Sequence, residues 1–129
     1  MIFYVALGSA IGGVSRYLLG GLVQRLLGTT YPAGTLVINI SGSLLLGAIL
    51  RYAIETPTLS PEARALLTVG FCGGYTTFST FSYETVALLK DGEWAQAAIY
   101  VAASVLLSIA GVLLGFGLAR EIINLRGRI

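Results

Sequence analysis

Polar side chains that could bind a small ion recur every four residues within two apolar segments. One series is Thr35, Asn39 and Ser43, and the other is Tyr100, Ser104 and Ser108. A spacing of four keeps side chains on one face of a helix. Amide N–H and hydroxyl O–H groups can donate hydrogen bonds to an anion. Asn39 is therefore interpreted either as a contact between helices or as a donor that faces a pore.

A third apolar segment has a composition that is unusual for a helix. It carries no charge from Ala65 to Tyr83, and its first half is rich in glycine, its second half in serine and threonine. Irregular backbone in a membrane survives only where protein or water surrounds it. We expect a break near Gly73 to Thr77 that turns freed backbone groups toward an interior path. A continuous helix with small residues on its contact face is the alternative.

Two phenylalanines and one arginine in the apolar segments could act on an anion. The edge of a phenyl ring is partially positive, so Phe78 and Phe81 could approach an anion edge-on. Their spacing of three places both rings on a similar helical face. The residues by themselves favour lipid contact or packing for these rings. Arg16 lies within the first apolar stretch, and an anchoring role near the interface is favoured over a direct role with substrate.

The composition excludes several classes of protein. Of 129 residues 56% are hydrophobic and 11% charged, against about 25% charged in soluble domains, which indicates an integral membrane protein. A net charge of +2 gives no reason to expect nucleic acid. A membrane enzyme is disfavoured because there is no histidine and a single cysteine, Cys72. A proton-coupled exchanger needs an acid within a span, and Glu84 is expected at the edge of one, at the interface or paired with Arg16. A passive bundle of helices gives no reason for the break.

These patterns predict an all-α, polytopic membrane protein with four transmembrane helices, the third broken mid-membrane, in a single domain over residues 1–129. The expected spans are Ile2 to about Val23, Ala33 to about Leu50, a third that follows an N-cap at Ser60 and ends at Glu84 or Lys90, and a fourth that starts at Trp94 and continues toward Arg120. Both termini then lie on one side. The bias of basic loop residues mildly favours a cytoplasmic N-terminus but leaves orientation weakly specified. Association into an oligomer is the natural way to bury the polar series, and a twofold dimer is the commonest closed form.

Three sequence blocks carry a resemblance to a known family. They are Gly12-Gly13-Val14-Ser15-Arg16-Tyr17, Gly34-Thr35-Leu36-Val37-Ile38-Asn39-Ile40-Ser41-Gly42 and Gly70-Phe71-Cys72-Gly73-Gly74-Tyr75-Thr76-Thr77-Phe78-Ser79-Thr80-Phe81. These blocks resemble the Fluc (CrcB) fluoride channels, and the resemblance covers essentially the whole chain. It implies a fluoride-selective channel that exports fluoride passively from the cell and protects it from fluoride toxicity. It also implies a multi-pass protein of the bacterial inner membrane and no enzymatic activity.

The resemblance further implies an assembly and a set of site residues. The assembly is an antiparallel, dual-topology homodimer in membrane lipid, with two fluoride pores. Phe78 and Phe81 would line the pores and Asn39 would face the ion. Thr35, Ser104 and Ser108 would form a polar track, with Tyr100 nearby. A structural Na⁺ at the dimer interface would be held by the backbone carbonyls of Gly73 and Thr76, while Arg16 would be an attracting or structural charge near the vestibule.

Overall fold

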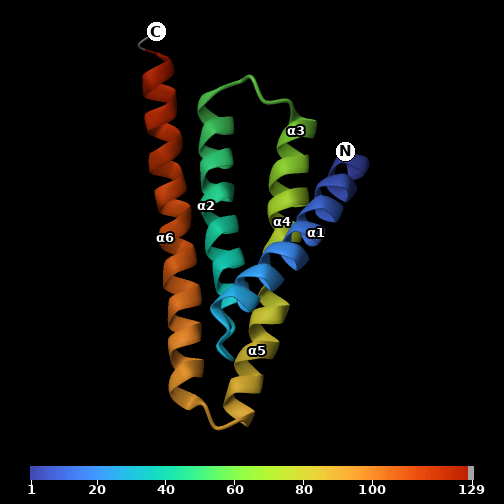
Figure 1. Cartoon of the computed structure of the whole chain (residues 1–129). Coiled ribbons are helices and arrows are strands. Elements are labelled where there is room, and N and C mark those ends of the chain that lie inside the picture. Colours follow the sequence, from blue (N-terminus) through green and yellow to red (C-terminus); the bar gives the residue numbers. More distant parts are fainter. Residues whose placement is uncertain (128–129) are drawn as a thin grey trace.

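The computed structural model describes residues 1–127, and within this range the chain is helical, with short loops and no strand. Its elements are α1 (Ile2–Leu27), α2 (Ala33–Glu55), α3 (Pro61–Ala65), the π-helix η1 (Leu66–Cys72), α4 (Gly73–Tyr75), α5 (Phe78–Lys90) and α6 (Trp94–Arg126) (Figure 1). Three of them, α1, α2 and α6, are long and apolar enough to cross a membrane. The segments from α3 to α5 follow one another as a fourth, broken leg, and the start of α1 and the end of α6 lie toward the same end of the bundle (Figure 1). The prediction of an all-α, polytopic membrane protein is confirmed.

Three helices continue beyond the ends that the sequence predicted. Helix α1 ends at Leu27, α2 at Glu55 and α6 at Arg126, each a turn or more past the expected residue. Polar and charged residues mark where a span leaves the hydrocarbon, but they do not stop a helix, because Arg, Glu and Gln are good helix formers. The predicted N-cap is confirmed, since the Ser60 hydroxyl accepts a hydrogen bond of 3.1 Å from the Ala63 N–H.

The third leg breaks at two threonines, at the end of the predicted range. Thr76 and Thr77 are extended, with ψ of 162° and 120°, whereas Gly73 keeps helical angles of φ −65° and ψ −38°. The Thr77 hydroxyl then caps α5 by accepting a hydrogen bond of 3.2 Å from the Thr80 N–H. A threonine is a good cap because its side-chain oxygen satisfies one of the free N–H groups at a helix start.

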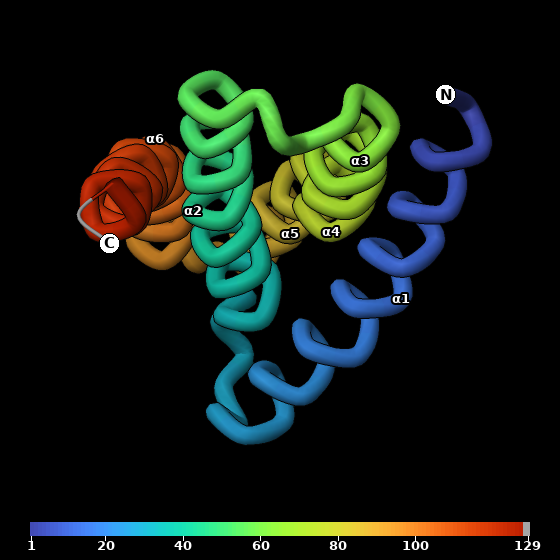
Figure 2. Tube along the Cα trace, turned by 90° about the horizontal axis from the view of Figure 1, so that it is seen from above, coloured from blue at the N-terminus to red at the C-terminus, as the bar shows by residue number. Residues whose placement is uncertain are grey.

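The glycines of the third leg serve close packing against α1. Helix α1 runs obliquely across this leg (Figures 1 and 2). A Cβ on Gly12 would overlap the Phe71 carbonyl oxygen, and one on Gly74 would lie 2.7 Å from the Ser9 carbonyl oxygen. The two backbones can meet only because no side chain stands between them. Both interpretations of this segment were therefore partly right: the glycines form a contact face, and the break follows them.

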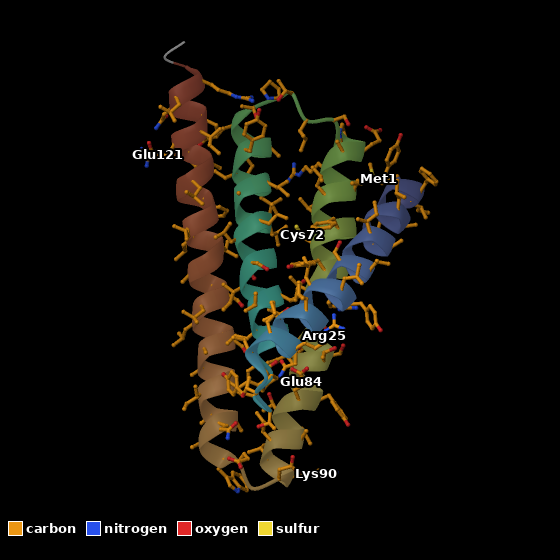
Figure 3. All side chains as sticks on the ribbon, in the orientation of Figure 1. Met1, Arg25, Cys72, Glu84, Lys90 and Glu121 are labelled. Carbon is orange, nitrogen blue, oxygen red and sulfur yellow. The ribbon has the colours of Figure 1, made fainter. Side chains whose placement is uncertain are left out.

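Helices α2 and α6 lie side by side along most of their length (Figures 1 and 2). Glycines again allow the two backbones to lie close together. A Cβ on Gly47 would overlap the Val112 carbonyl oxygen, and a Cβ on Gly115 would overlap the Leu44 carbonyl oxygen. Lys90 lies at one end of the bundle and Glu121 toward the other, while Glu84 lies further in than Lys90 (Figure 3). Many large apolar side chains on the outer faces are exposed, as expected for a protein that faces lipid.

The contact between α1 and the broken leg yields a stability prediction. Gly12→Ala places a methyl group against the Phe71 carbonyl, so we expect overpacking to lower the free energy of unfolding by about 1–3 kcal/mol. Thermal unfolding of the purified protein in detergent measures this. The control is Gly117→Ala on α6, where a Cβ meets nothing within 4 Å. Equal melting temperatures for the two variants would show that the contact is looser than described.

Candidate functional site

The break in the third leg is closed by the side chain of Asn39 from α2. Its Oδ1 accepts a hydrogen bond of 2.8 Å from the Thr77 N–H, and its Nδ2 donates one of 3.0 Å to the Thr77 carbonyl. In a continuous helix the Thr77 N–H would instead donate to the Gly73 carbonyl. The amide therefore replaces the backbone acceptor that the Thr77 N–H loses, and it adds a donor to the Thr77 carbonyl, which as the N-cap carbonyl of α5 also accepts the first hydrogen bond of that helix. An amide has a second N–H, so Asn39 can hold the break and still offer a donor to a ligand.

Arg16 holds the neighbouring residue of the break. Its Nη1 donates a hydrogen bond of 3.1 Å to the Thr76 carbonyl, across from α1. Within residues 1–127 the single ion pair joins Arg51 to Glu55, so Arg16 does not pair with Glu84. The structure thus gives Arg16 a bond to the irregular backbone, in addition to its place on the wall of an open cavity.

A cavity of about 300 Å³ gathers most of the predicted pore residues beside the break. Its walls include Asn39, Phe78, Phe81, Ser104 and Ser108. The two phenyl rings have centroids 5.5 Å apart; Phe81 is 9% exposed and Phe78 is 78% exposed. The Ser104 hydroxyl oxygen is buried and has no hydrogen-bond partner within residues 1–127. An unused hydroxyl donor and two phenyl rings therefore line the same cavity.

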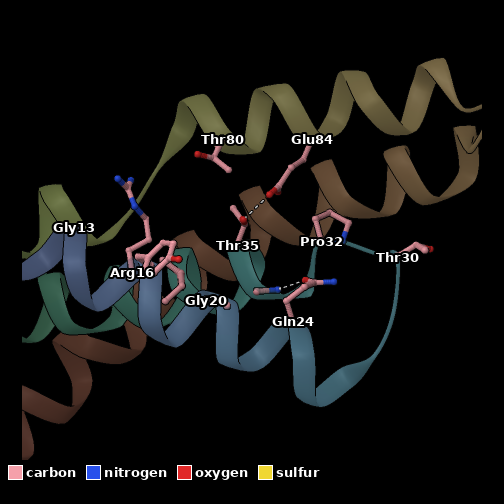
Figure 4. Close-up of a pocket in the computed structure, with 13 residues that line it drawn as sticks. Gly13, Arg16, Gly20, Gln24, Thr30, Pro32, Thr35, Thr80 and Glu84 are labelled. Atoms are coloured by element: carbon pink, nitrogen blue, oxygen red, sulfur yellow. Dashed lines mark hydrogen bonds between the residues drawn. The ribbon is translucent and has the colours of Figure 1, made fainter.

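Thr35 and Tyr100 lie together at a second point, around a carboxylate. The Thr35 hydroxyl donates 2.8 Å to Glu84 Oε1, and the Tyr100 hydroxyl donates 2.6 Å to Glu84 Oε2 (Figure 4 shows the first bond). Glu84 therefore accepts hydrogen bonds from two residues of the predicted polar track and does not pair with Arg16, while its position at the membrane interface stays a prediction. The helix restarts at Phe78, so Glu84 lies only about 9 Å along α5 from its start. The signal available in the sequence was its spacing of three from Phe81, which places both residues on one face.

An open cavity of about 560 Å³ leads to this carboxylate. It lies between α1, α2 and α5, and Arg16, Gln24, Thr35, Thr80 and Glu84 are among its lining residues (Figure 4). Gly13 and Gly21 also line it, and a Cβ on either would meet nothing within 4 Å. The α1 wall of this cavity therefore alternates glycines with the larger side chains of Arg16, Tyr17 and Gln24.

The backbone at the break has the chemistry of a cation site in part. The Gly73 carbonyl has lost its helical partner, because the Thr77 N–H donates to Asn39. The Thr76 carbonyl accepts from Arg16, but a carbonyl oxygen has a second lone pair. Within residues 1–127 no three His, Cys, Asp or Glu residues gather as metal ligands. A hard cation at this place would therefore depend on carbonyl oxygens, which such ions accept as ligands.

Comparison with known proteins gives one consistent match. The sequence model of the family described as CrcB-like protein, Camphor Resistance (CrcB), matches residues 3–116. A protein of Geobacter sulfurreducens named fluoride-specific ion channel FluC is 48% identical over 121 residues, covering 94% of this chain and 98% of the relative. Proteins of the same name from Geobacter metallireducens and Nitrobacter winogradskyi are 47% and 46% identical, each over 94% of this chain and over 98% and 96% of their own lengths.

The Asn39 contact yields a prediction about the fold around the site. Asn39→Leu keeps a similar volume but leaves the Thr77 N–H without an acceptor, so we expect the free energy of unfolding to fall by about 1–3 kcal/mol. Thermal unfolding in detergent tests this, with Ser43→Ala, one turn further along α2, as the control. A melting temperature for Asn39→Leu equal to that of the control would mean that Thr77 does not depend on the amide.

Proposed function

The chain belongs to the CrcB-like family, and from this we propose that it is a fluoride-selective channel of the membrane and not an enzyme. The observation that carries the proposal is the cavity beside the break. It combines the unpaired Ser104 hydroxyl with the amide of Asn39 and the rings of Phe78 and Phe81. The relatives' name supports the choice of ion, because each of the three is called a fluoride-specific ion channel.

The chemistry of this cavity suits a small, strongly hydrated anion. Fluoride gives up its water donors only where protein donors replace them at close range. The Ser104 and Ser108 hydroxyls and the second N–H of Asn39 can do so, and the partially positive edges of Phe78 and Phe81 can complete the shell. Arg16, on the wall of the open cavity, adds a positive charge near the approach. Passive flow through such a path would let a cell export fluoride and avoid its toxicity.

An antiparallel homodimer in the bacterial inner membrane would complete the path. Phe78 is 78% exposed in the single chain, and Ser79 and Thr80 are also exposed although they lie just past the break in the membrane-spanning leg. The Ser79 and Thr80 hydroxyls contact the Thr77 hydroxyl within the chain, and a second copy would cover their remaining polar surface, which is costly to leave facing lipid. The weak bias of basic residues between the two sides is compatible with chains inserted in both orientations. Two copies would give two pores.

A structural Na⁺ between the two copies would use the carbonyls freed at the break. Gly73 is exposed on the surface of the chain, and its carbonyl lacks the helical partner that Thr77 would supply. In an antiparallel pair the two breaks can meet near the centre of the bilayer, where the Gly73 and Thr76 carbonyls of both copies would surround the ion. A cation bound there would contribute a fixed positive charge near an anion path.

The first test of this function is ion selectivity. Purified protein in liposomes loaded with fluoride or chloride should release fluoride rapidly, and chloride no faster than protein-free liposomes do, as ion-selective electrodes would record. Fluoride release should also proceed without a pH gradient. Equal chloride release would contradict selectivity. Release that requires a proton gradient would favour a proton-coupled exchanger that uses Glu84, the acid that accepts hydrogen bonds from Thr35 and Tyr100.

A second test addresses the assembly and its cation together. Crystals grown in Na⁺ should contain two copies related by a twofold axis, with opposite orientations and density on the axis between the Gly73 and Thr76 carbonyls. Oxygen distances shorter than a hydrogen bond would indicate the cation, whereas distances of about 2.8 Å in hydrogen-bonding geometry would indicate water. Two copies in the same orientation would exclude the antiparallel dimer.

A further inference from the structure

Tyr100 is the residue through which the Glu84 carboxylate is fixed to the core. Its side chain is fully buried, and its hydroxyl donates to Glu84 Oε2 over 2.6 Å. Its ring packs against two other rings. The Phe81 ring is tilted at a centroid distance of 5.2 Å, and the Tyr31 ring stands edge-on at 5.6 Å. Phe81 comes from the adjacent helix α5, but Tyr31 comes from the loop between α1 and α2.

That loop is held in place by the side chain of Gln24 near the end of α1. Its Nε2 donates hydrogen bonds of 2.6 Å to the Thr29 carbonyl and 2.9 Å to the Tyr31 carbonyl. Its Oε1 accepts one of 3.0 Å from the Gly34 N–H at the start of α2 (Figure 4). Both N–H donors of this amide thus bind the loop, and its oxygen binds the first turn of α2. The Tyr31 N–H is bound as well, to the Thr29 hydroxyl over 3.1 Å.

We propose that Gln24 and Tyr31 are positioning residues for the ion path, because the clamped loop seats the Tyr31 ring against Tyr100 and so holds the Tyr100 hydroxyl on Glu84. The inference rests on the proposed function. Loss of the Tyr31 ring removes one of the two aromatic neighbours of Tyr100. The freed Tyr100 then releases Glu84 Oε2, so that the carboxylate keeps only the Thr35 donor, and its less neutralised charge on the wall of the open cavity repels an approaching anion.

The ring of Tyr31, and not its hydroxyl, carries this role. Within residues 1–127 the Tyr31 hydroxyl makes no hydrogen bond, whereas the ring packs on the cluster of Phe81, Leu88, Ala97 and Tyr100. Burial raises the pKa of the Tyr31 phenol above its ordinary value, so this side chain stays neutral at physiological pH. Phenylalanine should therefore replace Tyr31 without effect, and a smaller side chain should not.

The experiment compares fluoride efflux from liposomes that contain full-length variants. Tyr31→Ala and Gln24→Met should each slow efflux about threefold to tenfold, the range that loss of one aromatic edge contact allows. Tyr31→Phe should match the parent protein, and so should Tyr83→Ala, which removes an exposed tyrosine of α5. In a Tyr100→Phe background Tyr31→Ala should add little further loss, because residues that act through one another are not additive. Full additivity, or unchanged efflux for Tyr31→Ala, would overturn the inference.

A structural measurement separates this inference from the proposed function. In a crystal structure of the Tyr31→Ala protein the distance between the Tyr100 hydroxyl and Glu84 should exceed 3.5 Å, beyond a hydrogen bond. This longer distance is expected whether or not the parent protein conducts fluoride. An intact bond of 2.6 Å in the variant would overturn the positioning role even if fluoride selectivity is established. If Tyr31→Ala does not fold, Tyr31→Leu provides the same comparison, since it retains an apolar side chain without a ring.

Discussion

The pair of hydrogen bonds between Asn39 and Thr77 is the constraint on which the rest of the site depends. A helix interrupted inside a membrane leaves backbone N–H and C=O groups without hydrogen-bond partners. Each unpaired group destabilises the fold, because no water is present there to bond it. Asn39 accepts from the freed Thr77 N–H and also donates to the Thr77 carbonyl from a neighbouring helix, and the Thr77 hydroxyl caps the start of α5. Because the helix restarts at this point, Phe78 and Phe81 lie immediately beside the break.

Close packing by glycine is what allows other helices to reach the break. Gly12 and Gly74 let α1 cross the third leg at backbone contact, and this brings Arg16 near enough to donate to the Thr76 carbonyl. On the other side Gly42 permits the same approach, since a Cβ there would overlap the Thr76 methyl group. The irregular backbone is thus enclosed by α1 and α2, as a break in a membrane must be.

The fold and much of the site could be predicted because they depend on periodic patterns. The spacing of four placed Asn39 and Ser104 correctly on inward faces, and the helix-breaking composition located the interruption to within a few residues. The position of Glu84 could not be derived in this way, because it depends on where α5 restarts. No repeating sequence pattern predicts the contacts of Gln24 with the loop, because they join a single side chain to irregular backbone. Such contacts become visible only when the path of the loop is known.

The structure also divides the hydroxyls of the predicted polar track into two kinds. A hydroxyl has one proton to donate. Thr35 and Tyr100 each donate their hydroxyl hydrogen bond to Glu84. These two bonds stabilise the carboxylate, since an unpaired charge is costly in a membrane. Ser104 has no such partner within residues 1–127 and lines the cavity with Asn39. An anion would therefore find its donors beside the break, while Thr35 and Tyr100 could serve it only by turning away from Glu84. Glu84 and an anion in the path would compete for the hydroxyl protons of Thr35 and Tyr100. The contacts that hold Tyr100 on Glu84 therefore affect the ion path as directly as the residues that line it.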